Sequence, residues 1–192
     1  MPSIKNYRGI IPAISCPFTA DHRIDEPALR QLASWLAGHE GVVAVMTNGH
    51  TGEVFSLTPA ERAEVTRIVA DELKGKMPVI SSIVCEGLAD AAEHARAAKA
   101  AGAVALDVMP PHHWLRFGFT NGHAMQYFDA IHKAAPDLDL VAHSVDDGGQ
   151  RLDARLRAIE LATAMVGDDQ RVGAGLHRQL GVFHVLDALE DQ

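Results

Sequence analysis

Short apolar runs rich in β-branched residues alternate along this chain with longer segments of helical period. The runs are Ile10–Ser15, Val42–Thr47, Val79–Val84, Val104–Met109 and Leu138–Ala142, and the helical segments between them are Glu26–His39, Pro59–Leu73, Leu88–Ala101 and Gly122–Ala135. Because each helical segment is long enough to carry the chain back across a sheet, the alternation predicts βα units around a parallel sheet. The fold class is therefore α/β, either an open doubly wound sheet or a (β/α)8 barrel.

Two kinds of boundary signal support these helices. Thr58, Pro59 and Glu61 place a capping hydroxyl, a proline and a glutamate at the first positions of the second helix, which is the pattern of a capping box. Gly75 and Gly102 follow the second and third helices, where a residue of left-handed conformation commonly ends a helix.

Charge and hydropathy indicate which classes of binding partner the chain can have. The chain has 17 Lys and Arg against 25 Asp and Glu, a formal charge of −8, and it lacks a basic block, which argues against nucleic acid and anionic membranes. No apolar stretch reaches the length of a membrane span, and the first residues do not resemble a secretory signal. We therefore expect a cytoplasmic protein that acts on small molecules. Cys16 and Cys85 lie in no CxxC spacing and are expected to be buried thiols.

The loops after the predicted strands decide the function, because ligands bind beyond the carboxyl ends of parallel strands. In the loop after Val42–Thr47, Gly49 and Gly52 flank His50 and Thr51, so that backbone N–H groups can turn toward an anion such as a carboxylate. The alternative is an ordinary glycine-rich turn. The phosphate-binding patterns GxGxxG and GxxxxGK[ST] are both missing from the sequence, which disfavours nucleotide binding.

Four segments together resemble the dihydrodipicolinate synthase / N-acetylneuraminate lyase family of Schiff-base aldolases and lyases. They are Gly9–Phe18 (GIIPAISCPF), Asn48–Glu53 (NGHTGE) with Leu57–Arg62 (LTPAER), Pro78–Ile83 (PVISSI) and Ala101–Pro111 (AGAVALDVMPP). These segments are collinear with the family pattern over about residues 5–142. The resemblance implies a TIM barrel that is usually a dimer or a dimer of dimers, with 2-keto acids such as pyruvate as substrates and no cofactor.

In that family a lysine on the sixth strand condenses with the keto group, and a Gly-Thr-Thr-Gly-Glu loop holds the keto-acid carboxylate. Here the loop is Gly49 to Glu53, so the resemblance implies that Gly49, Thr51, Gly52 and Glu53 bind the substrate and that Thr51 matches the second threonine. His50 stands where the first threonine relays protons, and an imidazole can take part in such a relay. His50 and Thr51 are thus the catalytic candidates.

The loop after the fourth predicted strand departs from the family pattern. A tyrosine-containing stretch of the family is replaced by Pro111, His112, His113 and Trp114, and the two histidines become candidates for substrate contacts. This change favours a divergent aldolase, dehydratase or hydratase-aldolase specificity over the reaction of lysine biosynthesis.

The resemblance ends near residue 142. The five lysines are Lys5, Lys74, Lys76, Lys99 and Lys133, and none stands where the family has its Schiff-base lysine. A complete barrel takes about 250 residues, so 192 residues with five predicted strands make an incomplete barrel of about five βα units. We divide the chain into a barrel part, 1–142, and a divergent part, 143–192, in which Leu152–Val166 and Val182–Leu189 have helical patterns.

Three functions remain open at this point. The first is a carbon–carbon or carbon–oxygen lyase of the Schiff-base type, as the resemblance implies, and a complete barrel of this kind would form a homo-oligomer. The second is a catalytically inactive barrel fragment that serves as an interaction module. The third is a metal-dependent hydratase with ligands drawn from His50, Glu53, His112 and His113. We predict no metal site among these residues, because neighbouring side chains such as His112 and His113 usually diverge and no HxH or HExxH spacing is present.

Overall fold

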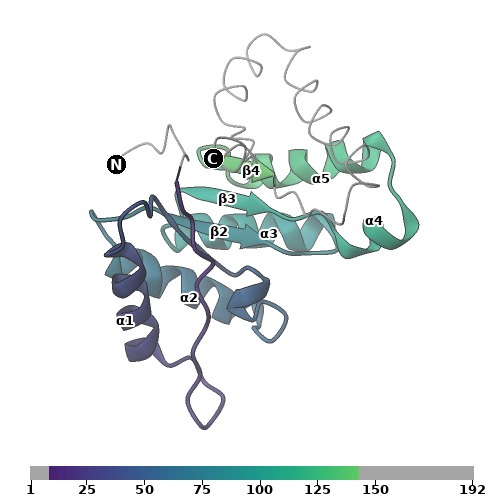
Figure 1. Cartoon of the computed structure of the whole chain (residues 1–192). Coiled ribbons are helices and arrows are strands. Elements are labelled where there is room, and N and C mark those ends of the chain that lie inside the picture. Colours follow the sequence, from purple (N-terminus) through teal and green to yellow (C-terminus); the bar gives the residue numbers. More distant parts are fainter. Residues whose placement is uncertain (1–8, 143–192) are drawn as a thin grey trace, which may run out of the picture.

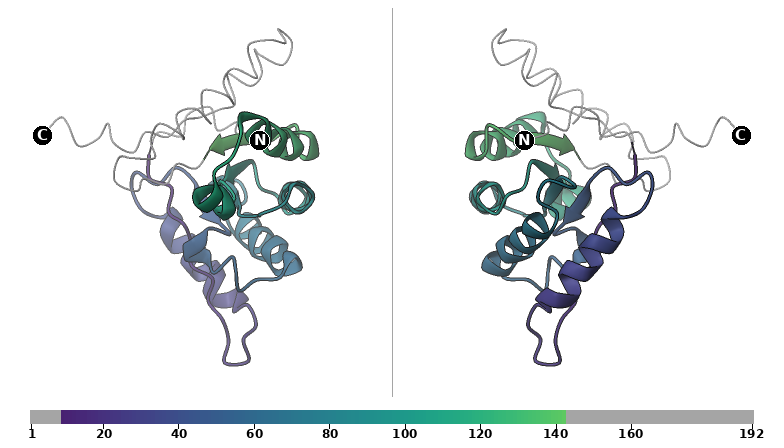
Figure 2. Two further views of the ribbon diagram at one scale, coloured as in Figure 1. Left: turned by 90° about the vertical axis from the view of Figure 1, so that its right-hand side faces the viewer. Right: turned by 90° about the vertical axis from the view of Figure 1, so that its left-hand side faces the viewer.

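The computed structural model describes residues 9–142 of the chain. In chain order the elements are α1 (Glu26–Ala37), β1 (Val45–Thr47), the short 3-10 helix η1 (His50–Gly52), α2 (Pro59–Glu72), β2 (Val79–Ile83), α3 (Leu88–Ala100), β3 (Ala105–Val108), α4 (His112–Phe117), α5 (Asn121–Ala134) and β4 (Asp139–Ala142). Figures 1 and 2 show the strands as one layer, with the long helices arranged along one side of it. This arrangement confirms the predicted α/β class.

The four strands form one parallel sheet in the order β1-β2-β3-β4. Val45 pairs with Val79, Ile80 with Ala105, and Ala105 with Asp139. Because all the strands run in the same direction, their last residues lie along one edge of the sheet, which we call the carboxyl edge. The loops that follow β1, β2 and β3 are therefore neighbours in space.

One face of the sheet packs against the helices. Near β1, Leu29 of α1 and Ile68 of α2 join Val45 and Val79 in one apolar cluster. Near β3, a second cluster combines Ile83, Leu106 and Leu140 of the strands with buried residues of α3 and α5, among them Ala91, Ala95, Tyr127 and Ile131. The alanines of α3 allow close approach of helix and sheet, so this helix covers β2 and β3 with small side chains.

The other face carries a smaller apolar cluster and a polar pair. Ala44, Ile80 and Ala105 pack together with Ile11. Beside them Ser82 donates a hydrogen bond of 2.9 Å to the Asp107 carboxylate, and both residues are almost fully buried. In a closed barrel this face is the interior.

The first predicted strand, Ile10–Ser15, is only partly formed. Two isolated parallel bridges, Ile10 with Val42 and Ala13 with Met46, replace a continuous ladder. The N–H groups of Ile10 and Ile14 both donate to carbonyls of the adjacent segment, residues 41–46, but Pro12 between them has no N–H to donate. The prediction of a full strand was therefore wrong at this position, because the proline removes the middle donor.

The predicted helices and their boundaries are confirmed within one or two residues. Thr58 and Glu61 form the expected capping box, in which the Thr58 hydroxyl accepts from the Glu61 N–H and the Glu61 carboxylate accepts from the Thr58 N–H. Gly75 and Gly102 both have positive φ, as predicted for residues that end helices. The helices expected at Leu152–Val166 and Val182–Leu189 lie outside the described residues.

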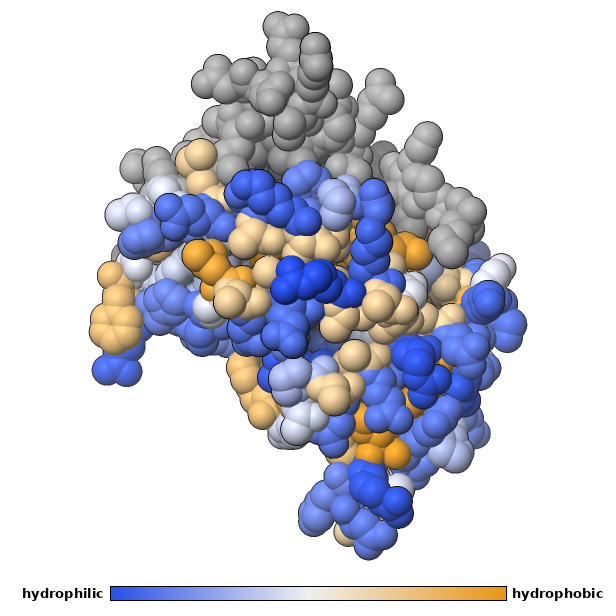
Figure 3. Space-filling model, turned by 180° about the vertical axis from the view of Figure 1, so that it is seen from behind, coloured by the Kyte–Doolittle hydropathy of each residue, from blue (hydrophilic) through white to orange (hydrophobic). Residues whose placement is uncertain are grey.

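The surface carries several large apolar side chains. Trp35, Phe55 and Phe117 are each more than half exposed, and Figure 3 shows hydrophobic residues interspersed with hydrophilic ones on the far side of the molecule. Among the helices described, none is both long and apolar enough to span a membrane.

The helix-facing core supports a stability prediction. Leu106 of β3 is fully buried, whereas Leu88 at the start of α3 is 42% exposed. Leu106→Ala should lower the free energy of unfolding by about 2–5 kcal/mol because it leaves a cavity, and Leu88→Ala should change it by less than about 0.5 kcal/mol. Urea unfolding of both variants measures the difference, and equal effects would show that the described packing is wrong.

Candidate active site

The glycine-rich loop predicted to bind a carboxylate forms a tight turn at the carboxyl edge. Gly49 precedes η1, and the turn closes through hydrogen bonds from Gly52 N–H to the Gly49 carbonyl and from Glu53 N–H to the His50 carbonyl. A Cβ on Gly52 would lie 3.0 Å from the Ile14 carbonyl oxygen, a tight contact, so the close approach of these segments favours glycine there. Thr51 is exposed in the middle of the turn, where its hydroxyl can reach a ligand.

Asn48 fixes the start of this loop through hydrogen bonds to α2. It has a positive φ of 60° and is 4% exposed. Its amide nitrogen donates to the Arg62 carbonyl at 3.0 Å and to the Thr66 hydroxyl at 2.9 Å. Both partners belong to α2, so Asn48 attaches the loop that carries His50 to the second helix.

Glu86, in the loop after β2, organises the neighbouring loop. Its Oε1 accepts from both the N–H and the Nδ1 of His112, each at 2.9 Å. Its Oε2 accepts from the N–H of His113 at 3.2 Å and from its Nδ1 at 2.6 Å. One carboxylate thus holds the two imidazoles and also satisfies the first two N–H groups of α4, where a negative charge is favourable.

The charge state of Glu86 follows from these bonds. Burial raises the pKa of this carboxyl, but the hydrogen bonds from His113, from the two backbone N–H groups and from His112 lower it, and the balance takes it from 4.5 to about 2. Glu86 is therefore ionised at neutral pH and accepts from both rings.

His112 joins this carboxylate to His50. The Nε2 atoms of His50 and His112 lie 3.2 Å apart. Because Glu86 accepts from Nδ1 of His112, the hydrogen-bond network assigns the Nδ1–H tautomer to the neutral ring, and its Nε2 lone pair points toward His50. The chain Glu86–His112–His50 can therefore pass a proton between the loops after β1 and β3.

An exposed aromatic ring covers this histidine pair. The ring centroid of Phe55 lies 5.4 Å from that of His50 and 5.4 Å from that of His112. Phe55 itself is 65% exposed, so the histidine pair lies beside an aromatic ring at the surface of the molecule.

Two of the remaining predicted residues are held by other side chains. His113 is held by Glu86 and its ring lies 6.2 Å from that of Trp114, while Glu53 accepts a 3.4 Å hydrogen bond from Ser56 within its own loop. His50 and His112 meet, as their positions after neighbouring strands suggested. Glu86 and Phe55 were missed, although Glu86 follows the predicted strand Val79–Val84 and the same rule about loops after strands identifies it.

The described lysines lie far from these loops. Lys74 and Lys76 follow α2, and Lys99 and Lys133 are in the last turns of α3 and α5. These helices run back from the carboxyl edge, so their ends lie at the opposite edge of the sheet. Lys99 pairs with Asp137 and Lys133 with Asp129.

Comparison with known proteins identifies the family of the chain. The sequence profile of the Dihydrodipicolinate synthetase family matches residues 6–163. The chain belongs to this family. The resemblance found in the sequence is thereby confirmed.

Two relatives illustrate the range of the family. A probable 5-dehydro-4-deoxyglucarate dehydratase from Bradyrhizobium is 34% identical over 165 residues, which cover 86% of this chain and 51% of the relative. The N-acetylneuraminate lyase of Escherichia coli is 29% identical over 140 residues, which cover 73% of this chain and 46% of the relative. The chain therefore spans about half the length of the relatives it matches.

Solved structures support the fold. The sialic acid aldolase of Ruminococcus gnavus superposes with a TM-score of 0.66 at 28% identity, covering 81% of this chain and 52% of the aldolase. YagE, a prophage protein of the dihydrodipicolinic acid synthase family from E. coli, superposes with a TM-score of 0.68 at 21% identity, covering 92% of this chain and 63% of YagE. The parallel sheet and its helices are thus part of the (β/α)8 barrel of this family.

The lowered pKa of Glu86 predicts a pH-dependent stability. A carboxyl whose pKa falls on folding stabilises the protein above its unfolded pKa, near 4.5, and this stabilisation is lost as the pH falls toward about 2. Glu86→Gln should therefore be less stable than the parent protein at pH 7 and equally stable near pH 2. Denaturant unfolding across this range measures the difference, and a difference that does not vary with pH would contradict the assignment.

Proposed function

We propose that this protein, a member of a family of lyases, binds a pyruvate-like 2-keto acid at the carboxyl edge of its sheet and can move protons there, without the Schiff-base lysine of the family. The observation that carries the proposal is the chain Glu86–His112–His50, which ends beside the turn from Gly49 to Gly52. A keto acid needs a site for its carboxylate and a group that moves protons near its keto oxygen. The two loops offer these functions side by side.

The turn is the proposed carboxylate site. Thr51 is exposed at its centre and can donate to an anion through its hydroxyl. Gly52 keeps the turn close to the segment of Ile14. The family resemblance assigns the same role to these positions, because Thr51 matches the second threonine of the Gly-Thr-Thr-Gly-Glu loop.

The histidine pair is the proposed acid and base. His50 replaces the threonine that relays protons in the family, and its Nε2 faces His112 at 3.2 Å. The Glu86 carboxylate stabilises a positive charge on His112, so that His112 can take a proton from His50 and return it. In this proposal His50 faces the substrate and His112 connects it to Glu86.

In the family that the chain resembles, a Schiff base between a lysine and the keto group accepts the electrons of the reaction. This chemistry needs a lysine near the keto carbon. The described lysines lie at the opposite edge of the sheet, and the sequence has no lysine after Lys133. We therefore expect the 192-residue chain to bind the keto acid without forming the covalent adduct.

Titration with pyruvate tests the proposal. We expect pyruvate to shift the ring signals of His50 and His112 in NMR spectra, and Thr51→Val to weaken this binding by about tenfold because a hydrogen bond to a charged group is lost. His39→Ala, at the exposed end of α1, is the control and should bind as the parent does. Absence of any shift on His50 and His112 would contradict the proposed site.

Borohydride reduction in the presence of pyruvate separates binding from covalent chemistry. No gain in mass is expected for the 192-residue chain. A reduced adduct on one of its lysines would contradict the expectation of non-covalent binding and show that this chain carries its own Schiff-base lysine. Binding without an adduct would leave the chain as a keto-acid-binding member of a lyase family.

A further inference from the structure

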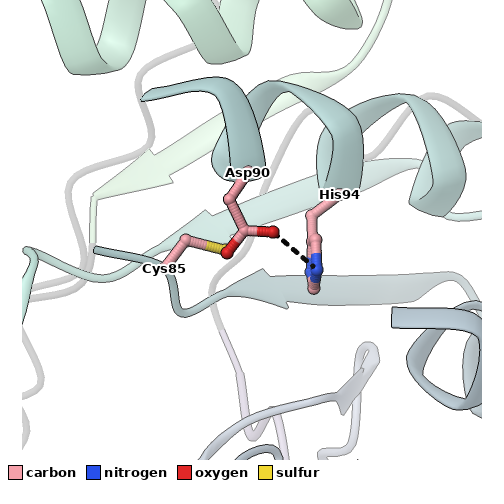
Figure 4. A group of neighbouring side chains, drawn as sticks. All are labelled: Cys85, Asp90 and His94. Carbon is pink, nitrogen blue, oxygen red and sulfur yellow. Dashed lines mark ion pairs between the residues drawn. The ribbon is translucent and has the colours of Figure 1, made fainter. Parts of the chain in front are cut away.

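A second polar cluster lies between β2 and α3, apart from the histidine pair. It consists of Cys85, which follows β2, and of Asp90 and His94, which are four residues apart on α3 and so share one side of that helix (Figure 4). One ligand atom from each residue, Cys85 Sγ, a carboxylate oxygen of Asp90 and a ring nitrogen of His94, lies within 4.8 Å of the other two. The proposed function uses none of these three side chains.

We propose that Cys85, Asp90 and His94 form a binding site for a zinc ion. Thiolate, carboxylate and imidazole are the three side-chain ligands that zinc takes in proteins. With bonds of about 2.0–2.3 Å, ligand atoms around tetrahedral zinc lie about 3.3–3.6 Å from one another. His94 Nε2 and Asp90 Oδ1 are already 3.4 Å apart, so the Cys85 sulfur, within 4.8 Å of both, needs to approach them by at most about 1.5 Å.

Burial and charge suit a divalent cation. Cys85 and His94 are 5% and 7% exposed, whereas about half of the Asp90 side chain is exposed and gives the ion a route from solvent. Burial and the nearby Asp90 carboxylate raise the pKa of the Cys85 thiol to about 12, so zinc binding releases the thiol proton to solvent and forms the zinc–sulfur bond. The Cys85 thiolate and the Asp90 carboxylate then balance the two charges of the ion.

A cavity beside His94 leaves room for a fourth ligand. It has a volume of about 340 Å³ and is bounded by α2, α3 and β2, with Asn48, Arg62 and His94 in its wall. Asn48 Oδ1 is buried in this wall and accepts no hydrogen bond within the described part of the chain. A water molecule in the cavity could donate to Asn48 and complete the coordination of the ion.

The Arg62 guanidinium competes with zinc for the ring nitrogen of His94. Its Nη1 lies 3.3 Å from Nε2 of His94 and donates to the lone pair that zinc would use. Burial and the Arg62 guanidinium hold the pKa of His94 below its usual range, so the ring is neutral and able to ligate. Zinc must displace the Arg62 contact, and a variant without this guanidinium should bind the ion more tightly.

Zinc at this position would act on the candidate active site through the backbone. Cys85 immediately precedes Glu86, and the Cys85 carbonyl accepts a 3.0 Å hydrogen bond from the buried Tyr127 hydroxyl. An ion bound to the Cys85 sulfur would hold the loop from its other side. The site is therefore a structural one that fixes the position of the Glu86 carboxylate.

Zinc titration of the chelator-treated 192-residue protein tests the proposal. We expect one zinc ion per chain and a rise in the unfolding temperature. Cys85→Ser and His94→Gln should each weaken zinc binding more than tenfold (~1.4 kcal/mol), and Arg62→Gln should strengthen it. Cys16→Ser removes the other buried thiol and is the control that should bind as the parent does.

Cobalt in place of zinc gives a spectrum of the parent protein itself. This measurement remains informative even if one of the variants fails to fold. A sulfur-to-cobalt charge-transfer band in the parent protein, lost in Cys85→Ser and kept in Cys16→Ser, supports the site. A cobalt spectrum without that band, with binding abolished by His50→Ala, would overturn the proposal and place the metal on the histidine pair. Absence of zinc and cobalt binding would also overturn it. The pyruvate titration is made without metal, so its result tests the proposed function independently of the zinc site.

Discussion

The parallel register of β1 to β4 is the constraint on which the rest of this structure depends. It brings the ends of β1, β2 and β3 to one edge, so residues far apart in sequence, 50, 86 and 112, become neighbours. The helices pack on one face of the same sheet with apolar and small side chains. The loops at the carboxyl edge are therefore where the residues of the candidate active site come together.

Within that edge, two polar anchors hold the loops in place before any ligand arrives. Asn48 bonds the loop after β1 to α2, and Glu86 bonds the loop after β2 to the start of α4. The Glu86 carboxylate has two effects, because it bonds the first N–H groups of α4 and also accepts from Nδ1 of His112. An arrangement of this kind reduces the reorganisation that proton transfer would otherwise require.

The sequence predicted the framework better than it predicted the site. The alternation of apolar runs and helical segments located four strands and four helices, since strands buried on both faces leave continuous apolar runs and helices packed on the sheet leave a helical period. Pro12 weakened the first strand through a missing donor. Helix α4 was not predicted because its capping acceptor, Glu86, is 26 residues away in the chain. The meeting of His50 with His112 likewise depends on the strand order, which periodicity alone does not specify.

The most direct test of the central claim is the tautomeric state of His112, read from two-bond proton–nitrogen correlations of the protein with labelled histidine. If the Glu86 carboxylate organises the relay, neutral His112 carries its proton on Nδ1, and Glu86→Gln changes the ring signals of both His112 and His50. A proton on Nε2 of neutral His112, or signals that do not respond to Glu86→Gln, would contradict the account.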